Sequence, residues 1–211
     1  MTGVQSYLNS NLIIFQIQNT IKSNTFKIIS GDLKGRKFYF PDSDGLRPTS
    51  GKTRETLFNW IQFEIAGKTV LDPFSGSGAL GIEAVSRGAK KALLIEKNTK
   101  VFKSLKSNLK VLGSSKFELV NDDSFKYLKK LEHNAFDYIF LDPPFSQKIL
   151  PLILNFLSGS VLLHPKSKVY IESEFKITEE FLVNHCGYEC KIEKEKKSGN
   201  VYFCLVSLGV L

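Results

Sequence analysis

The sequence predicts an α/β fold, in which a mostly parallel seven-stranded sheet is covered by helices on both faces. From residue 69 onward, short apolar runs alternate with stretches of helical periodicity, and this alternation is typical of parallel strands joined by helical crossovers. The last two strand-like runs flank Lys197-Ser198-Gly199-Asn200, which favours a tight hairpin and therefore an antiparallel C-terminal edge. The 211 residues, 42% of them hydrophobic, are enough for one substantial domain.

Two segments precede the helix that leads into the sheet. Residues 1–25 are rich in Asn, Gln and Ser and lack clear periodicity, so we expect a loosely ordered leader. Phe26 to Phe40 has β-prone ends around Gly31-Asp32-Leu33-Lys34-Gly35, which predicts a hairpin. We expect a small hairpin-and-helix appendage over residues 26–62 and the sheet domain over residues 63–211.

Each further element is predicted from its own pattern. A helix capped by Thr49 or Ser50 runs through Ile61, because Leu57, Phe58 and Ile61 then share one face. Strands are expected at 69–71, 92–95, 117–120, 138–141, 169–171, 188–195 and 201–208. Helices are expected at 79–87, 101–112, 124–131 and 149–157.

Positive charge is concentrated near the start of the chain. The net charge is +8 and, within residues 1–54, eight Lys or Arg face three Asp. This balance favours a polyanionic partner, with nucleic acid first and a membrane surface second. A basic enzyme without such a partner is the alternative.

Other composition signals point to an intracellular protein. The three cysteines, Cys186, Cys190 and Cys204, are sparse and odd in number, so we expect reduced thiols and no metal site. The sequence shows neither a transmembrane run nor a signal peptide, and we therefore expect a cytoplasmic protein without a membrane partner.

A glycine-rich turn follows the first strand of the sheet and opens a helix. Gly76, Gly78 and Gly81 match the spacing of a dinucleotide fingerprint, and Glu96 ends the next strand where a ribose-binding acid belongs. The turn therefore fits either an NAD-like dinucleotide or S-adenosylmethionine, and a turn that only packs is a third interpretation. Asp72 favours S-adenosylmethionine, because it suits the sulfonium and ammonium cations and would repel a pyrophosphate. The predicted cofactor-binding residues here are Asp72, Phe74, Gly76, Gly78 and Glu96.

Two acids follow the third strand of the sheet. Asp123 is the candidate acceptor for an adenine amino group, and Asp122 is the alternative. Capping of the helix that begins near Ser124 explains either acid equally well.

The fourth strand ends on Asp142-Pro143-Pro144-Phe145, the proposed catalytic motif. The prolines lack backbone N–H groups, which leaves carbonyls and a carboxylate as acceptors beside an aromatic ring. Such a corner suits a planar base: the acceptors hold its exocyclic amine, and Phe145 stacks on its face. A Pro-rich loop that merely closes the strand is the structural alternative.

These motifs resemble the RsmD family of bacterial 16S ribosomal RNA guanine-N2 methyltransferases. The resemblance is carried by the glycine turn and the Asp-Pro-Pro-Phe motif, and it spans about residues 26 to 205 in collinear order. Further matching segments are Gly35-Arg36-Lys37, Leu46-Arg47-Pro48-Thr49, Arg54-Glu55-Thr56-Leu57-Phe58-Asn59, Ile82-Glu83-Ala84 and Tyr170-Ile171-Glu172-Ser173-Glu174. The sequence departs from the family at Ser30-Gly31 and Gly51-Lys52, and residues 1–25 have no recognised counterpart.

The resemblance implies a Rossmann-like class I methyltransferase fold, with S-adenosylmethionine as cofactor, S-adenosylhomocysteine as product and no metal. It implies 16S rRNA as the partner, in an assembling small ribosomal subunit, and a monomeric enzyme. It also implies that Arg47 and Thr49 lie near the cofactor and the target base. The candidate phosphate contacts are Lys34, Arg36, Lys37 and Arg54.

Three alternatives remain at this point. A DNA adenine-N6 or cytosine-N4 methyltransferase would use the same amine chemistry, although such enzymes usually carry a larger recognition insert. An NAD-dependent oxidoreductase would share the glycine turn and leave Asp142 to Phe145 unexplained. A non-catalytic RNA-binding module would not need acids at four strand ends.

Overall fold

The computed structural model describes residues 23–43, 46, 49–132, 135–145, 148–187 and 189–209. Strands β1 (Ser23–Lys27) and β2 (Lys37–Pro41) pair antiparallel as the predicted hairpin. Helix α2 (Gly51–Trp60) follows, capped by the side chain of Ser50. The strand β1 begins at Ser23, so the expected leader boundary at residue 25 is corrected: residues 23–25 pair with residues 39–41, and this pairing outweighs their polar composition.

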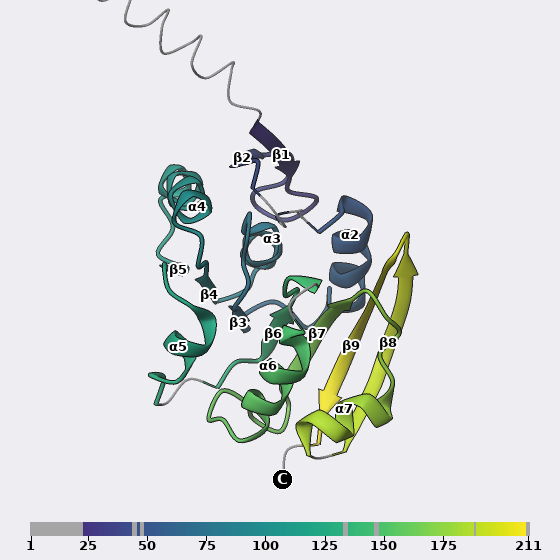
Figure 1. Ribbon diagram of the computed structural model, residues 1–211. Coiled ribbons are helices and arrows are strands. Elements are labelled where there is room, and N and C mark those ends of the chain that lie inside the picture. The colour runs from purple at the N-terminus through teal and green to yellow at the C-terminus, as the bar shows by residue number, and fades with distance from the viewer. Residues whose placement is uncertain are drawn as a thin grey trace, which may run out of the picture.

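Within the described residues, the main sheet has seven strands, as predicted, and their order is β5-β4-β3-β6-β7-β9-β8 (Figure 1). The first five are parallel to one another, and β9 runs antiparallel to both β7 and β8. Their bounds are β3 (Thr69–Asp72), β4 (Lys91–Ile95), β5 (Phe117–Val120), β6 (Tyr138–Leu141), β7 (Lys168–Ser173), β8 (Cys190–Ser198) and β9 (Val201–Leu208).

The helices between these strands agree with the sequence analysis, with one addition. They are α3 (Ala79–Ser86), α4 (Thr99–Leu112), α5 (Ser124–Leu128), α6 (Ile149–Ser158) and α7 (Glu179–Cys186). Helix α7 was not predicted. It has eight residues, of which only Leu182 and Cys186 are buried, so it carries almost no apolar period for a sequence pattern to detect.

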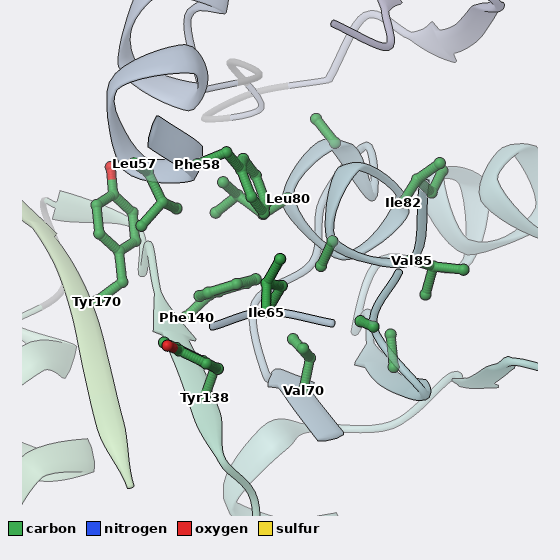
Figure 2. Close-up of a cluster of buried hydrophobic side chains, with 14 of the residues drawn as sticks. Leu57, Phe58, Ile65, Val70, Leu80, Ile82, Val85, Tyr138, Phe140 and Tyr170 are labelled. Carbon is green, nitrogen blue, oxygen red and sulfur yellow. The ribbon is translucent and has the colours of Figure 1, made fainter. Parts of the chain in front are cut away.

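Alternating strand residues divide the core into two layers. One layer lies under α2, α3 and α4 and contains Val70, Phe140 and Tyr170; the other lies under α5, α6 and α7 and contains Leu71, Ile139 and Ile171. Figure 2 shows the first layer, in which Leu57 and Phe58 of α2 and Leu80 of α3 meet the strand side chains. Each face of the sheet is therefore closed by its own set of helices.

The N-terminal hairpin packs into the first layer of this core. Phe26, Phe38 and Phe40 are buried in the same cluster as the residues of α3. The Phe26 and Phe38 rings stack with centroids 5.5 Å apart. Side chains on both sides of the predicted domain division at residue 62 thus share one apolar cluster.

The carboxylate of Glu83, on α3, joins the hairpin to the sheet domain. It is 0% exposed and accepts backbone N–H groups from Ile29 (2.9 Å) and Ser30 (3.0 Å). It also pairs with Arg87 (2.8 Å) and with Arg54 of α2 (3.3 Å). One buried side chain therefore binds three separate segments of the chain.

Arg54 lies inside this network, which corrects the prediction that it contacts RNA phosphate. Its side chain donates to the carbonyls of Lys27 (3.0 Å) and Thr49 (3.3 Å), in addition to its bond to Glu83. The residue is only 3% exposed, so its guanidinium is not available to a phosphate. Arg54 is instead an internal link between the hairpin, α2 and α3.

The hairpin turn is held against the C-terminal part of α3. Ser86 accepts the backbone N–H of Leu33 (3.0 Å) and donates to the carbonyl of Ser30 (2.6 Å). A Cβ on Gly31 would lie 1.8 Å from the Ser86 carbonyl oxygen, and the φ of Gly31 is +81°. Only glycine allows this approach without displacing backbone.

We expect Glu83→Gln to lower the free energy of unfolding by about 3–5 kcal/mol, because it leaves the Arg54 charge buried without its counter-ion. Urea unfolding, followed by fluorescence and circular dichroism, measures this change. Glu55→Gln, at an exposed position of α2, is the matched control and should change stability by no more than about 0.5 kcal/mol. Equal, small effects of the two substitutions would contradict the proposed role of the Glu83 network.

Candidate active site

Three buried or partly buried carboxyl groups lie on one face of three adjacent strands. Asp72 ends β3, Asp142 directly follows β6, and Glu172 is in β7. They are two residues beyond Val70, Phe140 and Tyr170, which face α2 and α3, so the carboxyl groups face the same way. The parallel register pairs Leu141 with Ile171, which places Asp142 beside Glu172. We call Asp72, Asp142 and Glu172 the carboxyl row.

Two members of the carboxyl row accept hydrogen bonds from hydroxyl groups. Thr49 Oγ1 donates to Asp142 Oδ2 over 3.1 Å, and Tyr170 OH donates to Glu172 Oε1 over 2.9 Å. Figure 2 shows the Tyr170 hydroxyl pointing toward α2 at Leu57. Thr49 thus contacts Asp142 directly, while its predicted place near the cofactor and the target base stays a prediction.

Asp72 differs from the other two acids, because part of it has no partner. The residue is 1% exposed, and among the described residues its Oδ2 is the one buried side-chain oxygen or nitrogen without a hydrogen bond. A buried carboxylate oxygen in this state is costly unless a donor or a cation reaches it. The atom therefore indicates a ligand with a positively charged or N–H group.

Burial makes the carboxyl row hard to ionise. It raises the pKa of Asp72 to about 8, and the neighbouring Asp142 and Glu96 add to the rise. Burial also raises the pKa of Asp142 to about 6, although the hydrogen bond from Thr49 opposes the shift. The pKa of Glu172 is raised well above its ordinary value by burial and by the adjacent Asp142. A cation bound beside the row would favour its ionised form.

The glycine turn lies next to Asp72 and is bound to Glu96. The backbone N–H of Gly76 donates to Glu96 Oε2 (2.9 Å), and the N–H of Asn98 donates to Oε1 (2.6 Å). Gly78 precedes α3 with a φ of +79°, and a Cβ there would lie 2.5 Å from Leu105. A Cβ on Gly76 would lie 2.9 Å from Leu46, so the segment before α2 reaches over the turn.

Helix α3 also needs a glycine for its approach to the sheet. A Cβ on Gly81 would lie 2.2 Å from Leu94 of β4. Close helix–strand packing is the role of the third glycine in nucleotide-binding turns. The close approaches of the turn and of α3 thus require glycine at three positions, and Phe74 in the turn is partly exposed.

The two candidate adenine ligands have protein partners in this structure. Asp123 caps α5 by accepting the N–H of Lys126 (3.2 Å) and pairs with Lys97 (3.0 Å). Asp122 pairs with Lys130 (3.2 Å). The hydrogen bond from Lys97 is the main reason that the pKa of Asp123 is lowered. Capping is therefore observed, and the adenine contact stays a prediction.

The other predicted site residues differ in their exposure to solvent. Pro143 is buried, Pro144 is exposed and Phe145 is partly exposed. Arg47 lies outside the described residues. The hairpin residues Lys34, Arg36 and Lys37 are exposed.

Two buried acids, Glu172 and Glu83, have roles that the sequence motifs did not indicate. Glu172 is 4% exposed and lies next to last in a buried strand, so the strand-end rule that selected Asp72 and Asp142 could have found it. Glu83 has no such signal, because all of its partners except Arg87 lie tens of residues away in the chain. Over the described ranges, no group of three His, Cys, Asp or Glu side chains is arranged to hold a metal ion. No described helix is long and apolar enough to cross a bilayer.

Two solved structures share this architecture at more than 30% identity. An Escherichia coli protein provisionally described as a methyltransferase superposes with a TM-score of 0.75 at 33% identity, covering 88% of this chain and 98% of that one. A Haemophilus influenzae protein provisionally described as a methylase gives a TM-score of 0.72 at 34% identity, covering 89% and 100%.

Sequence comparisons identify the family. The family model described as conserved hypothetical protein 95 matches residues 26–207. Ribosomal RNA small subunit methyltransferase D of Buchnera aphidicola (subspecies Acyrthosiphon pisum) is 41% identical over 155 residues, or 74% of this chain and 81% of the relative. The protein of the same name from Escherichia coli K12 is 42% identical over 154 residues, or 72% and 76%. The chain therefore belongs to the conserved hypothetical protein 95 family, the family of ribosomal RNA small subunit methyltransferase D.

Proposed function

We propose that this protein transfers a methyl group from S-adenosylmethionine to the exocyclic N2 of a guanine in 16S ribosomal RNA. The observation that carries the proposal is the position of Asp142, a partly buried acid fixed by Thr49 beside the unpartnered carboxyl oxygen of Asp72. The names of the relatives, ribosomal RNA small subunit methyltransferase D, support the class of substrate.

The residues around Asp72 fit S-adenosylmethionine as the cofactor. Its sulfonium and ammonium groups supply the positive charge that the carboxyl row lacks, whereas the pyrophosphate of a dinucleotide would be repelled. Gly76, Gly78 and Glu96, which lie in and against the turn that follows Asp72, would bind the rest of the cofactor. When bound, the cofactor supplies an electrophilic methyl group and leaves as S-adenosylhomocysteine.

Asp142 and Pro143 would prepare the amine for attack. An exocyclic amine on an aromatic base is a weak nucleophile, because its lone pair is delocalised into the ring. Acceptance of both N–H groups by the Asp142 carboxylate and the Pro143 carbonyl localises that lone pair and orients it. Asp142 then takes the proton that the nitrogen releases once its new bond to carbon has formed. Phe145 stacks on the base, which must leave its helix or loop to reach the site.

The carboxyl row also favours guanine over adenine. The guanine edge presents two neighbouring donors, N1–H and the N2 amine, whereas adenine presents its amine beside an acceptor, N1. Asp142 and Glu172 are neighbouring acids on adjacent strands, which matches two donors side by side. Once the bound cationic cofactor favours the ionised form of the row, an acceptor at adenine N1 would face a carboxylate and be disfavoured.

The exposed hairpin supplies cations for the RNA backbone. Lys34, Arg36 and Lys37 are exposed and can contact phosphates near the target nucleotide. The same proposal includes a monomeric enzyme in the cytoplasm that acts on an assembling small subunit. The proposal also places Arg47 near the target base. It keeps Asp123, with Asp122 as the alternative, as the acid that binds the adenine amino group of the cofactor.

The identity of the methylated nucleoside tests the proposed function directly. The protein is incubated with labelled S-adenosylmethionine and unmodified 16S RNA, free or in partly assembled particles, and the RNA is digested to nucleosides. We expect label in N2-methylguanosine. Label in N6-methyladenosine, or none in RNA, would reject the proposal.

We expect Asp142→Asn to lower the rate of methyl transfer by at least about 100-fold, because an amide cannot accept both the N–H and the released proton. Binding of S-adenosylmethionine, measured by calorimetry, should change little. Glu174→Gln, at an exposed position just beyond β7, is the control and should keep normal turnover. An Asp142→Asn enzyme with wild-type turnover would remove Asp142 from the mechanism.

The raised pKa of Asp72 predicts how stability depends on pH. Its carboxyl keeps a proton up to pH about 8 in the folded state but only to about 4 when unfolded, so the folded state binds more protons between these values. We therefore expect the free energy of unfolding of the cofactor-free protein to fall as pH rises from about 5 to about 8. Urea unfolding across this range should show a shallower fall for Asp72→Asn.

Two further measurements accompany this pH series. Asp122→Asn is the control, because the pKa of Asp122 is lowered, mainly by its hydrogen bond with Lys130, and its titration lies below this window. Added S-adenosylmethionine should stabilise the wild type more at pH about 8 than at pH about 5, since it binds the ionised row. Identical pH slopes for wild type and Asp72→Asn would contradict the assignment.

A further inference from the structure

The exposed sides of the hairpin and of α4 are joined into one surface. Strand β2 packs against α4, and the carbonyl of Tyr39 accepts hydrogen bonds from Ser104 (3.0 Å) and Asn108 (2.8 Å) of that helix. Lys100 Nζ also reaches the carbonyl of Asp42 just beyond β2 (3.4 Å). Figure 1 shows the hairpin on the same side of the sheet as α2, α3 and α4.

Three lysines of α4 form a stripe next to the hairpin. Lys100, Lys103 and Lys110 are exposed, and at 3.6 residues per turn they fall within an arc of about 80°. This arc borders the side of the helix that carries Ser104 and Asn108. The opposite side carries Val101 and Leu105, which are buried against the sheet. The stripe therefore faces solvent along the edge of the hairpin.

The Lys and Arg side chains of the hairpin and of α4 that the structure describes form no ion pairs with acids, unlike many other lysines of the protein. Among the described residues, acids pair with Lys68, Lys91, Lys97, Lys126, Lys130, Lys168 and Lys176. In the same part of the chain, no ion pair involves Lys27, Lys34, Arg36, Lys37, Lys100, Lys103, Lys106 or Lys110. Residues 23–43 and 97–116 together hold ten Lys or Arg against two Asp, and α4 has no acid.

The hairpin adds a like-charge pair. Lys27 and Lys37 are directly opposite in the β1–β2 register, and both are exposed. Like charges opposite each other on a strand pair are destabilising, so this arrangement repels itself in the free protein. An anion bound between the two side chains would remove the repulsion.

An exposed aromatic ring lies in the middle of the surface. Tyr39 is 55% exposed, and its backbone is fixed by the two hydrogen bonds from α4. Lys37 and Tyr39 alternate with the buried Phe38 and Phe40, so both point outward. An aromatic ring among unpaired cations is the combination that binds RNA, because phosphates meet the charges and an unpaired base stacks on the ring.

We propose that Lys27, Lys37, Tyr39, Lys100, Lys103 and Lys110, the hairpin–α4 surface, bind the substrate RNA beyond its target nucleotide. The proposal rests on the proposed function, since it places the flanking RNA relative to the methylation site. Helix α4 follows Asn98, whose N–H binds Glu96 beside the glycine turn. From there its 14 residues extend about 21 Å, enough to follow several phosphates away from the site. The hairpin and α4 are thus one continuous track for the RNA backbone.

Charge reversal on α4 tests the surface. The variant Lys100→Glu, Lys103→Glu, Lys110→Glu is compared with Lys191→Glu, Lys194→Glu, Lys196→Glu, which makes the same change in net charge on exposed positions of the edge strand β8. Affinity for unmodified 16S RNA is measured by filter binding at several salt concentrations. S-adenosylmethionine binding checks that each variant is folded.

We expect the α4 variant to lose at least about 30-fold in RNA affinity, and its plot of log affinity against log salt to become shallower by about two to three units. The β8 variant should lose at most a few-fold. Tyr39→Ser should weaken binding without changing the salt slope, because stacking does not release counterions. Wild-type affinity in the α4 variant, or equal losses in the two triple variants, would overturn the proposal.

RNA binding and methyl transfer are measured separately, so the two proposals fail separately. If the wild-type protein methylates guanine N2 and the α4 variant still binds RNA normally, only the proposal that the hairpin–α4 surface binds RNA is contradicted. A wild-type protein that binds RNA through α4 but forms no N2-methylguanosine contradicts only the proposed function. If the α4 variant lost affinity for an acidic protein but kept wild-type affinity for RNA, RNA would likewise be rejected as the occupant of the surface.

Discussion

The buried ion pair between Arg54 and Glu83 is the interaction on which the arrangement of the site depends. Glu83 holds the hairpin backbone at Ile29 and Ser30, and Arg54 extends from Glu83 to the carbonyl of Thr49. Thr49 in turn donates its hydroxyl to Asp142. A continuous series of polar contacts therefore runs from the hairpin to the proposed catalytic acid. Removal of Glu83 would leave the Arg54 charge buried without a counter-ion, whereas removal of Arg54 would leave Glu83 paired with Arg87 alone.

A second constraint acts at the ends of the strands. Asp72, Asp142 and Glu172 are held close together and away from water, where full ionisation is unfavourable. A structure that only needed stability would place apolar side chains here. The cost is consistent with a site that meets positive charge or N–H donors when its ligands bind, and raised carboxyl pKa values of this kind often accompany function.

The protein has an acidic region at the carboxyl row and a basic region on the hairpin and α4, and we propose that the two regions bind ligands of opposite charge. The acids of the carboxyl row are buried or partly buried, where we propose that a cationic cofactor and an amine bind, whereas the lysines without ion pairs on the hairpin and α4 are exposed, where we propose that phosphates bind. The hairpin belongs to both regions, because its inner side packs in the first core layer and its outer side carries the cations. The Arg54–Glu83 pair therefore connects the hairpin, and with it the proposed RNA-binding surface, to the geometry of the site.

Local patterns in the sequence determined most of the architecture. Apolar runs specified the strands of the main sheet other than β8, the hairpin residues around Gly199 specified β8, and helical periodicity specified all but one of the described helices. The glycine turn, Asp72 and Asp142 were identified from their positions after strands. Tertiary structure alone decided which charges are buried. Arg54 reads as a surface cation, yet it is internal, because its partner Glu83 is 29 residues away in the chain. The role of Glu172 likewise depends on the strand beside it. Burial and pairing are set by contacts between distant segments, whereas periodicity reports only on near neighbours in the chain.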